Sequence, residues 1–458
     1  MTAAPPADPR RWRPFRRAAA WLVLLGPLFY LSYGLANGWA AGRAHVPSVV
    51  FAWEHGIPFW PWTIFPYWSI NAFYALSLFL GRSRHGVDRH AARLLTVQLL
   101  AVTCFLLWPL HFSFGQPAAS GAPAFLFNAL RGFDQPFNQA PSLHIALAVI
   151  LWDWYRQFLH SSWARLLLHA WTLLICASVL TTWQHHFIDI PTGAALGVLC
   201  VWLWPLERVA ALPRAWRLAR EPRRRVLAGL YGLGATACLG LALVLAGSGY
   251  ALWLGWPALS LALVALNYAG LGARGFRMDS RGRMHWSARW LLAPCRLAAA
   301  LNAWLWTRSL PASVLVAPGL RLGRIPTLQE WTDAGRPRLL GLCAELQLPD
   351  VPGARCVPLL DLVPAPPRRL QRAVVLLDGQ AAAAAEAGVW VCCALGFSRS
   401  AATAVAWLCH VHPADGMAGA LATVRRARPQ MVLGTAWTGT LAYWAARQPA
   451  RPTHKETP

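Results

Sequence analysis

The sequence predicts an all-α polytopic membrane domain of about eight spans, followed by a cytoplasmic α/β domain. Of the 458 residues, 56% are hydrophobic and 13% are charged, and this charged fraction is about half of that in ordinary soluble domains. Apolar stretches long enough to cross a bilayer fill the chain up to residue 270. From 311 to 450, short apolar runs alternate with helical ones, which is typical of α/β folds.

These patterns divide the chain into five segments. We expect a cytoplasmic tail over 1–17, a membrane domain over 18–270, an amphipathic connector over 271–310, an α/β domain over 311–450 and a disordered tail over 451–458. Within the membrane domain, the candidate spans cover 18–37, 62–81, 94–112, 142–160, 164–182, 188–206, 226–246 and 250–270.

The basic residues orient the membrane domain. The net charge is +24, and arginines gather in loops on the N-terminal side of the spans, at 10–17, 82–93 and 208–225. Loops on the opposite side carry only Arg43 and Arg131. This bias predicts that both termini lie in the cytoplasm. The positive charge then contacts anionic lipid, so we expect the bilayer and no nucleic acid as a partner.

Composition also indicates the cellular setting. Lys455 is the one lysine, while Arg, Ala, Leu, Gly and Pro are abundant. This bias is typical of GC-rich bacterial genes, so we expect a bacterial inner membrane. The ten cysteines show neither a disulfide framework nor zinc spacing. Reduced thiols in a cytoplasmic domain suit a cysteine nucleophile.

The second half of the connector predicts an amphipathic helix on the cytoplasmic membrane face. Apolar residues alternate there with arginines between Ser287 and Arg308. The residues expected to face lipid are Trp290, Leu291, Leu292, Leu297, Trp304 and Trp306.

The loop from Val391 to Ser400 carries the most specific chemistry in the α/β domain. Gly388–Val391 predicts a short buried strand, and Ala401–Leu408 predicts a buried helix. The N-terminus of such a helix directs backbone N–H groups and partial positive charge into the loop. An arginine there grips phosphate oxygens in a fork, and the same field activates a cysteine thiol.

This loop resembles the Cys-x5-Arg signature of the cysteine-based phosphatases, in the form typical of the dual-specificity branch. The resemblance implies that Cys393 is the nucleophile, that Arg399 holds phosphate, and that Ser400 helps to break down the thiophosphate intermediate. It also implies that Gly396 and Ser398 belong to the phosphate-binding loop. The family usually has His before the nucleophile, where this chain has Cys392. The alternative is a pair of structural cysteines at a buried strand end.

Cysteine-based phosphoryl transfer needs an acid that protonates the leaving oxygen. In the resembled family an Asp supplies this proton from an upstream loop. Asp361 is the candidate, because it follows an apolar run and precedes a Pro-rich loop. Asp378 is the alternative, and a structural turn role for Asp361 stays open.

A second polar constellation lies at predicted span ends, over 138–144 and 181–189. Ionisable residues at membrane depth are costly and usually functional. His144 begins one span and His185 ends the next, so both imidazoles are expected at the periplasmic face. Asp189 follows His185 by one helical turn, where its carboxylate can orient the ring.

This pattern resembles the type 2 phosphatidic acid phosphatase superfamily, and its Pro-Ser-Leu-His form resembles the inositol-phosphoceramide-synthase-like subgroup. The resemblance implies that His185 attacks phosphorus, Asp189 orients it and His144 protonates the leaving group. The motif places Ser142 at the site. The superfamily's basic phosphate ligands are missing, since Gln116-Pro117 and Ser178-Val179 stand in their places. Arg131, Gln184 and His186 are candidate replacements.

Together the two constellations predict a bifunctional membrane phosphatase that acts on phosphorylated lipids. Candidate substrates are phosphatidic acid, phosphatidylglycerol-phosphate, phosphoinositide-like lipids and polyprenyl phosphates. One alternative is a lipid head-group phosphotransferase at the histidine site. The other is a membrane-anchored protein-tyrosine or dual-specificity phosphatase with an inactive membrane site. No metal or cofactor is expected, because both mechanisms use covalent phospho-enzyme intermediates.

Overall fold

The computed structural model describes residues 14–132, 134–206, 217–245, 249–384 and 387–446. The chain divides into two compact units, Met1–Glu207 and Arg208–Pro458. The predicted disordered tail over 451–458 and most of the tail over 1–17 lie outside the described residues.

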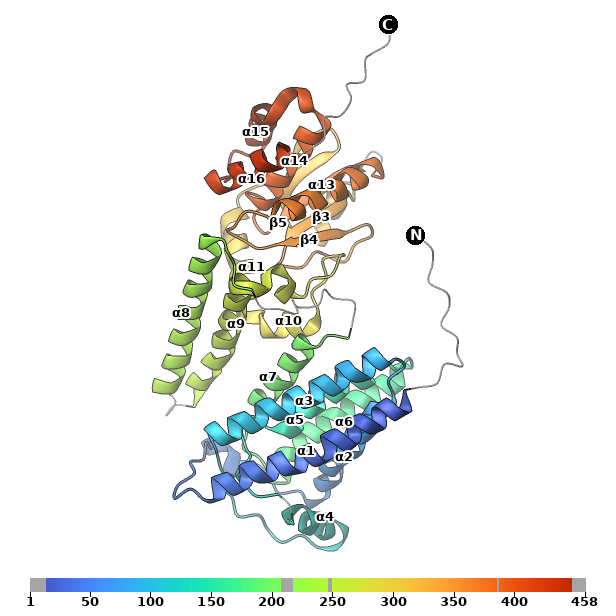
Figure 1. Ribbon diagram of the computed structural model, residues 1–458, viewed down its shortest axis with the longest axis vertical. Helices are drawn as coiled ribbons and strands as arrows, with labels where there is room; N and C mark the ends of the chain where they lie inside the picture. Colours follow the sequence, from blue (N-terminus) through green and yellow to red (C-terminus); the bar gives the residue numbers. More distant parts are fainter. Residues whose placement is uncertain (1–13, 133, 207–216, 246–248, 385–386, 447–458) are drawn as a thin grey trace. The chain divides into compact units, whose positions relative to one another are not determined.

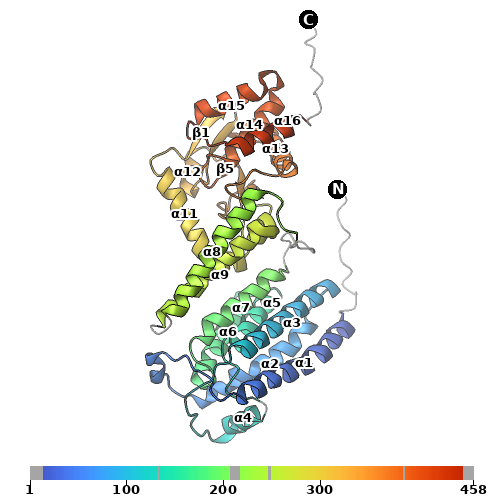
Figure 2. The ribbon, with the colours of Figure 1, turned by 60° about the vertical axis from the view of Figure 1, so that its left-hand side comes forward.

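The first unit is a bundle of helices (Figure 2). Its apolar helices are α1 (Phe15–Ala41), α2 (Ile64–Phe79), α3 (Arg84–Leu107), α5 (Leu143–Tyr155), α6 (Ser162–Thr181) and α7 (Asp189–Leu203), and the short α4 (Gly121–Arg131) joins α3 to α5. Glycines bring α5 and α7 together. A Cβ on Gly193 would lie 2.5 Å from the Ser142 oxygen, and one on Gly197 would lie 2.6 Å from the Ala146 oxygen. The two backbones therefore touch directly beside the predicted histidine site.

Each of the eight predicted spans overlaps a helix, but only five helical segments in the described chain are long and apolar enough to cross a membrane. They are Phe15–Ala41, Arg84–Leu107, Ser162–Thr181, Pro222–Val244 and Tyr250–Phe276. Helices α2, α5 and α7 have 16, 13 and 15 residues. At 1.5 Å per residue they are shorter than a hydrocarbon core of about 30 Å. The predicted spans over 142–160 and 188–206 were longer because they included loop residues at the helix ends.

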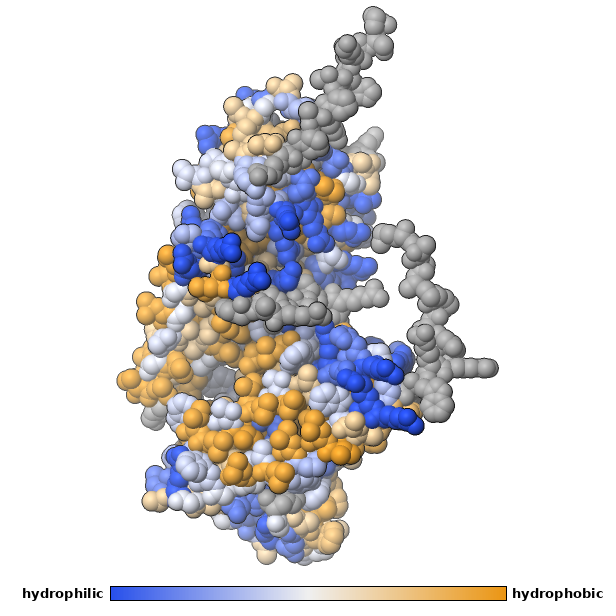
Figure 3. All heavy atoms as spheres, in the orientation of Figure 1, coloured by the Kyte–Doolittle hydropathy of each residue, from blue (hydrophilic) through white to orange (hydrophobic). Residues whose placement is uncertain are grey.

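The second unit begins with a helical hairpin. Helix α8 (Pro222–Val244) packs against α9 (Gly255–Leu266), which continues as a π-helical turn (Asn267–Leu271) and a 3-10 turn (Gly272–Phe276). Large apolar side chains on α8 are exposed (Figure 3), among them Val226, Leu230, Leu233, Leu239 and Leu243. The sequence analysis grouped this hairpin with the preceding spans up to 270, whereas in the structure it belongs to the same compact unit as the α/β domain.

The connector forms two helices, α10 (Trp286–Leu291) and α11 (Ala293–Thr307). Leu297, Trp304 and Trp306 are exposed, as predicted for a lipid-facing surface. The prediction is wrong for Leu291 and Leu292, which are fully buried. The chain turns between the two helices, so one continuous apolar stripe cannot form.

The α/β domain contains one five-stranded sheet in the order β1-β2-β5-β3-β4. Strands β2, β5, β3 and β4 run parallel, and β1 is antiparallel to β2. The strands are β1 (Ser313–Ala317), β2 (Leu320–Arg324), β3 (Arg338–Cys343), β4 (Arg355–Leu359) and β5 (Val389–Cys393). The helices are α12 (Leu328–Asp333), α13 (Pro367–Ala382), α14 (Arg399–Val411), α15 (Gly416–Ala427) and α16 (Thr435–Ala445), of which α13, α14 and α16 pack together beside the sheet (Figure 1).

Strand β5 is central and buried along its whole length. Because β2, β5 and β3 are parallel, the loops that follow their carboxyl ends gather at one edge of the sheet. The predicted phosphate loop and the segments after β3 and β4 are therefore brought together from distant parts of the sequence.

Candidate active sites

The loop between β5 and α14 is folded around the Cys393 sulfur. Cys393 ends β5 with 2% of its surface exposed, and α14 begins at Arg399. The backbone N–H of Gly396 donates to Cys393 Sγ at 3.3 Å. Gly396 has φ +77°, and a Cβ there would lie 2.4 Å from the carbonyl carbon of Gly323. Only glycine fits this turn, which directs an N–H at the sulfur.

Ser400 and Ser398 lie on either side of Arg399 and differ in their contacts. Ser400 Oγ lies 3.2 Å from Cys393 Sγ, within hydrogen-bonding distance. Ser398 stands at the N-cap of α14, where its side chain makes no capping hydrogen bond. The hydroxyl of Ser400 is therefore placed to stabilise a thiolate on Cys393, while Ser398 contributes to the shape of the loop.

Arg399 is held in a fork by a carboxylate that the sequence analysis did not identify. Its two terminal nitrogens donate to the Glu345 oxygens at 2.8 and 2.6 Å, and only 2% of its side chain is exposed. Burial alone lowers the pKa of Arg399, but the Glu345 and Asp361 charges outweigh it and raise the pKa well above its usual value. The Nε–H of Arg399 is buried without a partner among the described residues. This donor is free to bind a phosphoryl oxygen.

Asp361 lies beside the same arginine. It follows β4, its carboxylate lies 3.1 Å from an Arg399 terminal nitrogen, and 38% of its side chain is exposed. The Tyr268 hydroxyl donates to the Asp361 backbone oxygen at 3.0 Å. Asp378, the alternative acid, lies on α13 and accepts a hydrogen bond from Trp407 Nε1 at 3.3 Å. Of the two candidates, Asp361 is the one that contacts Arg399.

Cys392 occupies a different environment from its neighbour. It pairs with Gly323 on one side and Gly341 on the other, and it is fully buried. Burial, followed by the neighbouring thiol of Cys393, raises the pKa of Cys392 well above its usual value. Its thiol therefore stays protonated and packs within the sheet.

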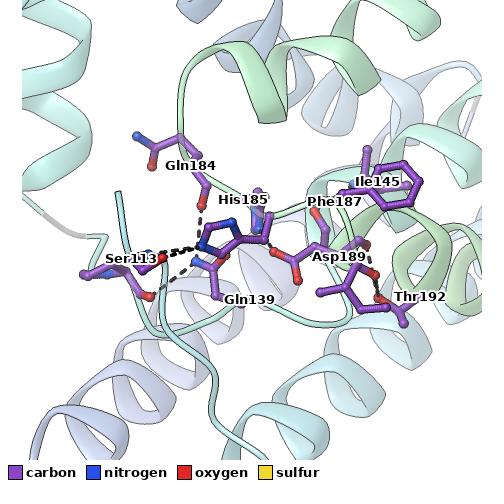
Figure 4. A network of polar contacts seen from close by, with 12 residues as sticks. Ser113, Gln139, Ile145, Gln184, His185, Phe187, Asp189 and Thr192 are labelled. Carbon is purple, nitrogen blue, oxygen red and sulfur yellow. Dashed lines mark hydrogen bonds and ion pairs between the residues drawn. The ribbon is translucent and has the colours of Figure 1, made fainter. Parts of the chain in front are cut away.

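In the first unit, the structure brings His185, Asp189 and His144 together. His185 Nδ1 lies 2.9 Å from Asp189 Oδ2, and Figure 4 shows the two side chains in contact. The rings of His144 and His185 have centroids 6.3 Å apart, and His144 stacks on Tyr67 at 3.9 Å. His144 Nε2 is buried without a hydrogen-bond partner in the described part of the chain.

A cavity of about 250 Å³ opens beside His185. Its lining includes Arg131 and Gln184, two of the candidate phosphate ligands, but also Asp134, which the sequence analysis missed. Arg131 donates to Gln116 Oε1 at 2.9 Å. The cavity thus has one cation opposed by one carboxylate.

Two residues of this cluster have partners within the protein. His186 Nδ1 lies 2.9 Å from Glu54 Oε2, and its Nε2 accepts the Ser113 N–H at 3.1 Å. Both ring nitrogens of His186 are therefore engaged inside the protein. Ser142 is fully buried and caps α5 by accepting the Ile145 N–H at 3.4 Å.

Comparison with known proteins finds similarity to solved structures only, and this similarity concerns the second unit. No family model matches the chain, and no curated protein matches it. Similar structures include Tk-PTP in its active form (21% identity), human DUSP28 (26%) and a mouse putative dual specificity phosphatase complexed with zinc tungstate (22%).

Each of these comparisons covers 30% of this chain, and 99%, 95% and 89% of the respective structure, with TM-scores of 0.27, 0.27 and 0.28. The matched proteins are phosphatases. Because the TM-scores are low, the functional assignment depends on the geometry around Cys393.

Proposed function

We propose that this protein is a membrane phosphatase that uses Cys393 to hydrolyse phosphate monoesters. The observation that carries the proposal is the arrangement around the sulfur, which receives the Gly396 N–H and lies 3.2 Å from the Ser400 hydroxyl. Arg399 follows at the start of α14 with a free Nε–H donor. A thiolate, an anion-binding helix N-terminus and a guanidinium are the parts that attack on phosphorus requires.

In the first step, the Cys393 thiolate forms a bond to phosphorus while the bond from phosphorus to the ester oxygen breaks. Asp361 transfers its proton to that oxygen, which leaves as an alcohol. Arg399 and the loop N–H groups stabilise the charge on the transferring phosphoryl oxygens. In the second step, water gives a proton to Asp361 and attacks phosphorus. The thiolate leaves, stabilised by Ser400, and inorganic phosphate is released.

We infer that the substrate is a phosphorylated lipid at the cytoplasmic membrane face. Two candidate spans, Pro222–Val244 and Tyr250–Phe276, belong to the same compact unit as the loop. Tyr268, in the extension of α9, donates directly to the Asp361 backbone. The exposed Leu297, Trp304 and Trp306 on α11 offer a further apolar surface to the bilayer. A membrane substrate is therefore delivered next to the reacting groups.

The test uses the full chain purified in detergent micelles, with phosphatidic acid, phosphatidylglycerol-phosphate, a phosphotyrosine peptide and a soluble aryl phosphate as substrates. Cys393→Ser is expected to lose phosphate release from the phosphotyrosine peptide and the soluble aryl phosphate, whereas Cys392→Ser, a matched change one residue earlier, retains most of it. Preference for the peptide over both lipids would favour the anchored protein phosphatase. Equal activity in Cys393→Ser and the wild type would disprove the cysteine mechanism.

A second activity is proposed at the histidine cluster of the first unit, facing the periplasm. The specific observation is the 2.9 Å contact of His185 with Asp189, with His144 across from it. His185 Nε2 forms a bond to phosphorus while the bond to the leaving oxygen breaks, and His144 protonates that oxygen. Water or a lipid hydroxyl then gives its proton to His144 and attacks phosphorus, which breaks the bond from phosphorus to His185. The single cation and opposing carboxylate of the cavity suit a phosphodiester, and so favour transfer between lipids.

His185→Ala tests this second activity, with the exposed His160→Ala as the matched control. Transfer of a labelled lipid head group to added diacylglycerol is the readout. Loss of transfer in His185→Ala alone supports a phosphotransferase, and loss of hydrolysis alone supports a lipid phosphatase. If both variants keep every activity of the wild type, the membrane site is inactive and the first unit serves as an anchor.

A further inference from the structure

The second unit contains a cavity of about 460 Å³ next to the loop that carries Asp361. Three segments form most of it: the start of α8, the turn Leu271–Arg274 after α9, and the segment Pro358–Pro367; Arg369 of α13 and Thr440 of α16 complete the lining. It has an apolar side made by prolines and leucines, and a polar side made largely by arginines. The reaction proposed for Cys393 does not use this cavity.

Its charged residues are four arginines and one glutamate. They are Arg220, Arg224, Arg274, Arg369 and Glu221. Arg274 is exposed and Arg369 is half-buried, and the described residues provide an ion pair to neither. Burial, then the charges of Arg274 and Arg372, lower the pKa of Arg369. Like charges are thus crowded here without enough carboxylates to neutralise them, which is the condition for binding an anion.

Arg224 provides an independent sign of a missing partner. One of its terminal nitrogens donates to the Asn267 backbone oxygen at 3.2 Å, which fixes the guanidinium at the cavity. Its Nε is buried and has no hydrogen-bond partner within the described parts of the chain. A buried donor without an acceptor costs free energy that a bound anion would recover.

The position of the cavity identifies the source of the anion. Arg224 is in the first turn of the candidate span Pro222–Val244, and Arg274 is near the end of the candidate span Tyr250–Phe276. The cavity therefore lies where two spans leave the bilayer, at the level of the lipid head groups. We infer that this cavity binds the phosphate group of an anionic membrane phospholipid, with its apolar side against the glycerol and upper acyl chain.

The bound lipid would act on the reaction through the acid loop, and this consequence rests on the function proposed for Cys393. Leu359, Leu360 and Val363 line the cavity. From the same short segment, the Leu359 oxygen accepts from Arg399 at 3.1 Å and the Asp361 carboxylate contacts that arginine. A head group in the cavity therefore orders the segment that positions the proton donor.

The experiment compares the wild type, Arg274→Ala/Arg369→Ala and the control Arg425→Ala/Arg426→Ala, which removes two exposed arginines from α15. The thermal midpoint of each full-length protein is followed in neutral detergent during titration with short-chain phosphatidylglycerol, phosphatidylcholine or inorganic phosphate. A ligand that binds only the folded state raises the midpoint. Phosphatidylglycerol is expected to raise it by several degrees in the wild type and the control, and by much less in the cavity variant.

Equal shifts in the cavity variant and the control would overturn the inference. An equal shift with inorganic phosphate would overturn the lipid assignment in favour of a free anion. The titration is repeated in Cys393→Ser, which is expected to bind phosphatidylglycerol as the wild type does. If this binding is seen but the wild type releases no phosphate from any substrate, the function proposed for Cys393 fails and the lipid site stands.

With activity present, phosphatidylglycerol is expected to raise kcat for the soluble aryl phosphate several-fold in the wild type and the control. The cavity variant should keep the basal rate and lose this activation. Activation that is unchanged in the cavity variant would contradict the coupling of the cavity to Asp361.

Discussion

The surroundings of Cys393 and of His185 differ in how each handles negative charge. Beside the cysteine, Arg399 is fixed by two hydrogen bonds that it donates to Glu345, and its Nε–H has no partner among the described residues. Beside the histidine, Arg131 is bound to the neutral Gln116, and Asp134 lines the same cavity. Both proposed nucleophiles have oriented side chains, but only Cys393 has a preorganised cation beside it. The difference teaches that orientation of a nucleophile and binding of a phosphate dianion are separate structural tasks.

The largest effect that would break this comparison is expected from Arg399→Lys. Lysine keeps the charge but cannot donate in a fork to Glu345 while presenting a third donor to phosphate. We expect kcat/KM for phosphate monoesters to fall by about 100-fold or more, which corresponds to about 3 kcal/mol of transition-state stabilisation. Steady-state phosphate release measures it, and the exposed Arg425→Lys is the control. A change below twofold would mean that the fork is dispensable.

The next effect concerns Glu345, whose replacement by Gln leaves the partly exposed Asp361 as the carboxylate beside the buried Arg399. Burial raises the pKa of Glu345, but the charge and hydrogen bonds of Arg399 outweigh this and give a net lowering. A carboxyl with a lowered folded-state pKa stabilises the protein above its unfolded pKa, and this stability is lost as pH falls through the folded pKa.

Glu345→Gln is therefore expected to destabilise the second unit by about 3 kcal/mol at pH 7, within the range for breaking a buried ion pair. The difference from the wild type should shrink in acid, below an unfolded-state pKa of about 4.3. Denaturant unfolding at several pH values measures it. A difference that stays constant down to pH 3 would contradict the ion-pair explanation.

Asp134→Asn tests the same comparison at the histidine site. It removes the carboxylate from the His185 cavity and leaves Arg131 unopposed there. We expect the KM for phosphate monoesters at this site to fall by about threefold to tenfold. The substitution removes a carboxylate that repels the phosphate, and water partly screens this repulsion. The assay is done in the Cys393→Ser background, so that the cysteine site does not contribute. An unchanged KM would show that Asp134 does not influence the bound phosphate.

The smallest effect is expected from Tyr268→Phe, which removes one hydrogen bond to the Asp361 backbone. Such a bond contributes about 1 kcal/mol, so kcat should fall by a few-fold while KM changes little. Tyr231→Phe, a change in the ring stacked on Tyr268, is the matched control. Equal losses in the two variants would indicate general loosening of the hairpin, and no specific positioning of the acid.

The elements around Cys393 were predictable because their signals are local. An apolar strand, a glycine turn and an apolar helix are contiguous in sequence, and the structure places them as expected. Glu345 was missed because it lies 54 residues from Arg399 in the sequence, and their contact depends on β3 lying next to β5. An acidic residue just after a predicted strand is the one signal that was available for it.

The membrane unit shows a different limit of sequence reasoning. A hydropathy pattern does not show where an apolar helix ends when the loop next to it also contains apolar residues. For this reason α5 and α7 are shorter than the spans predicted for them. The spacing to Asp189 singles out His185, but no sequence pattern predicts that His186 is engaged by Glu54, 132 residues earlier. Tertiary partners of this kind decide which histidine is free for chemistry.

The contact between α5 and α7 has a consequence for evolution of the histidine cluster. His144 is on α5, and Asp189, which orients His185, begins α7, so the approach of these helices fixes the gap between the imidazoles. At Gly193 a single added carbon would lie 2.5 Å from the Ser142 oxygen. Replacement of this glycine by alanine would push the two helices apart and separate His144 from His185, although no polar residue would be substituted. The absence of a side chain at Gly193 therefore sets the distance between the two imidazoles, and with it the distance over which the proposed proton transfer takes place.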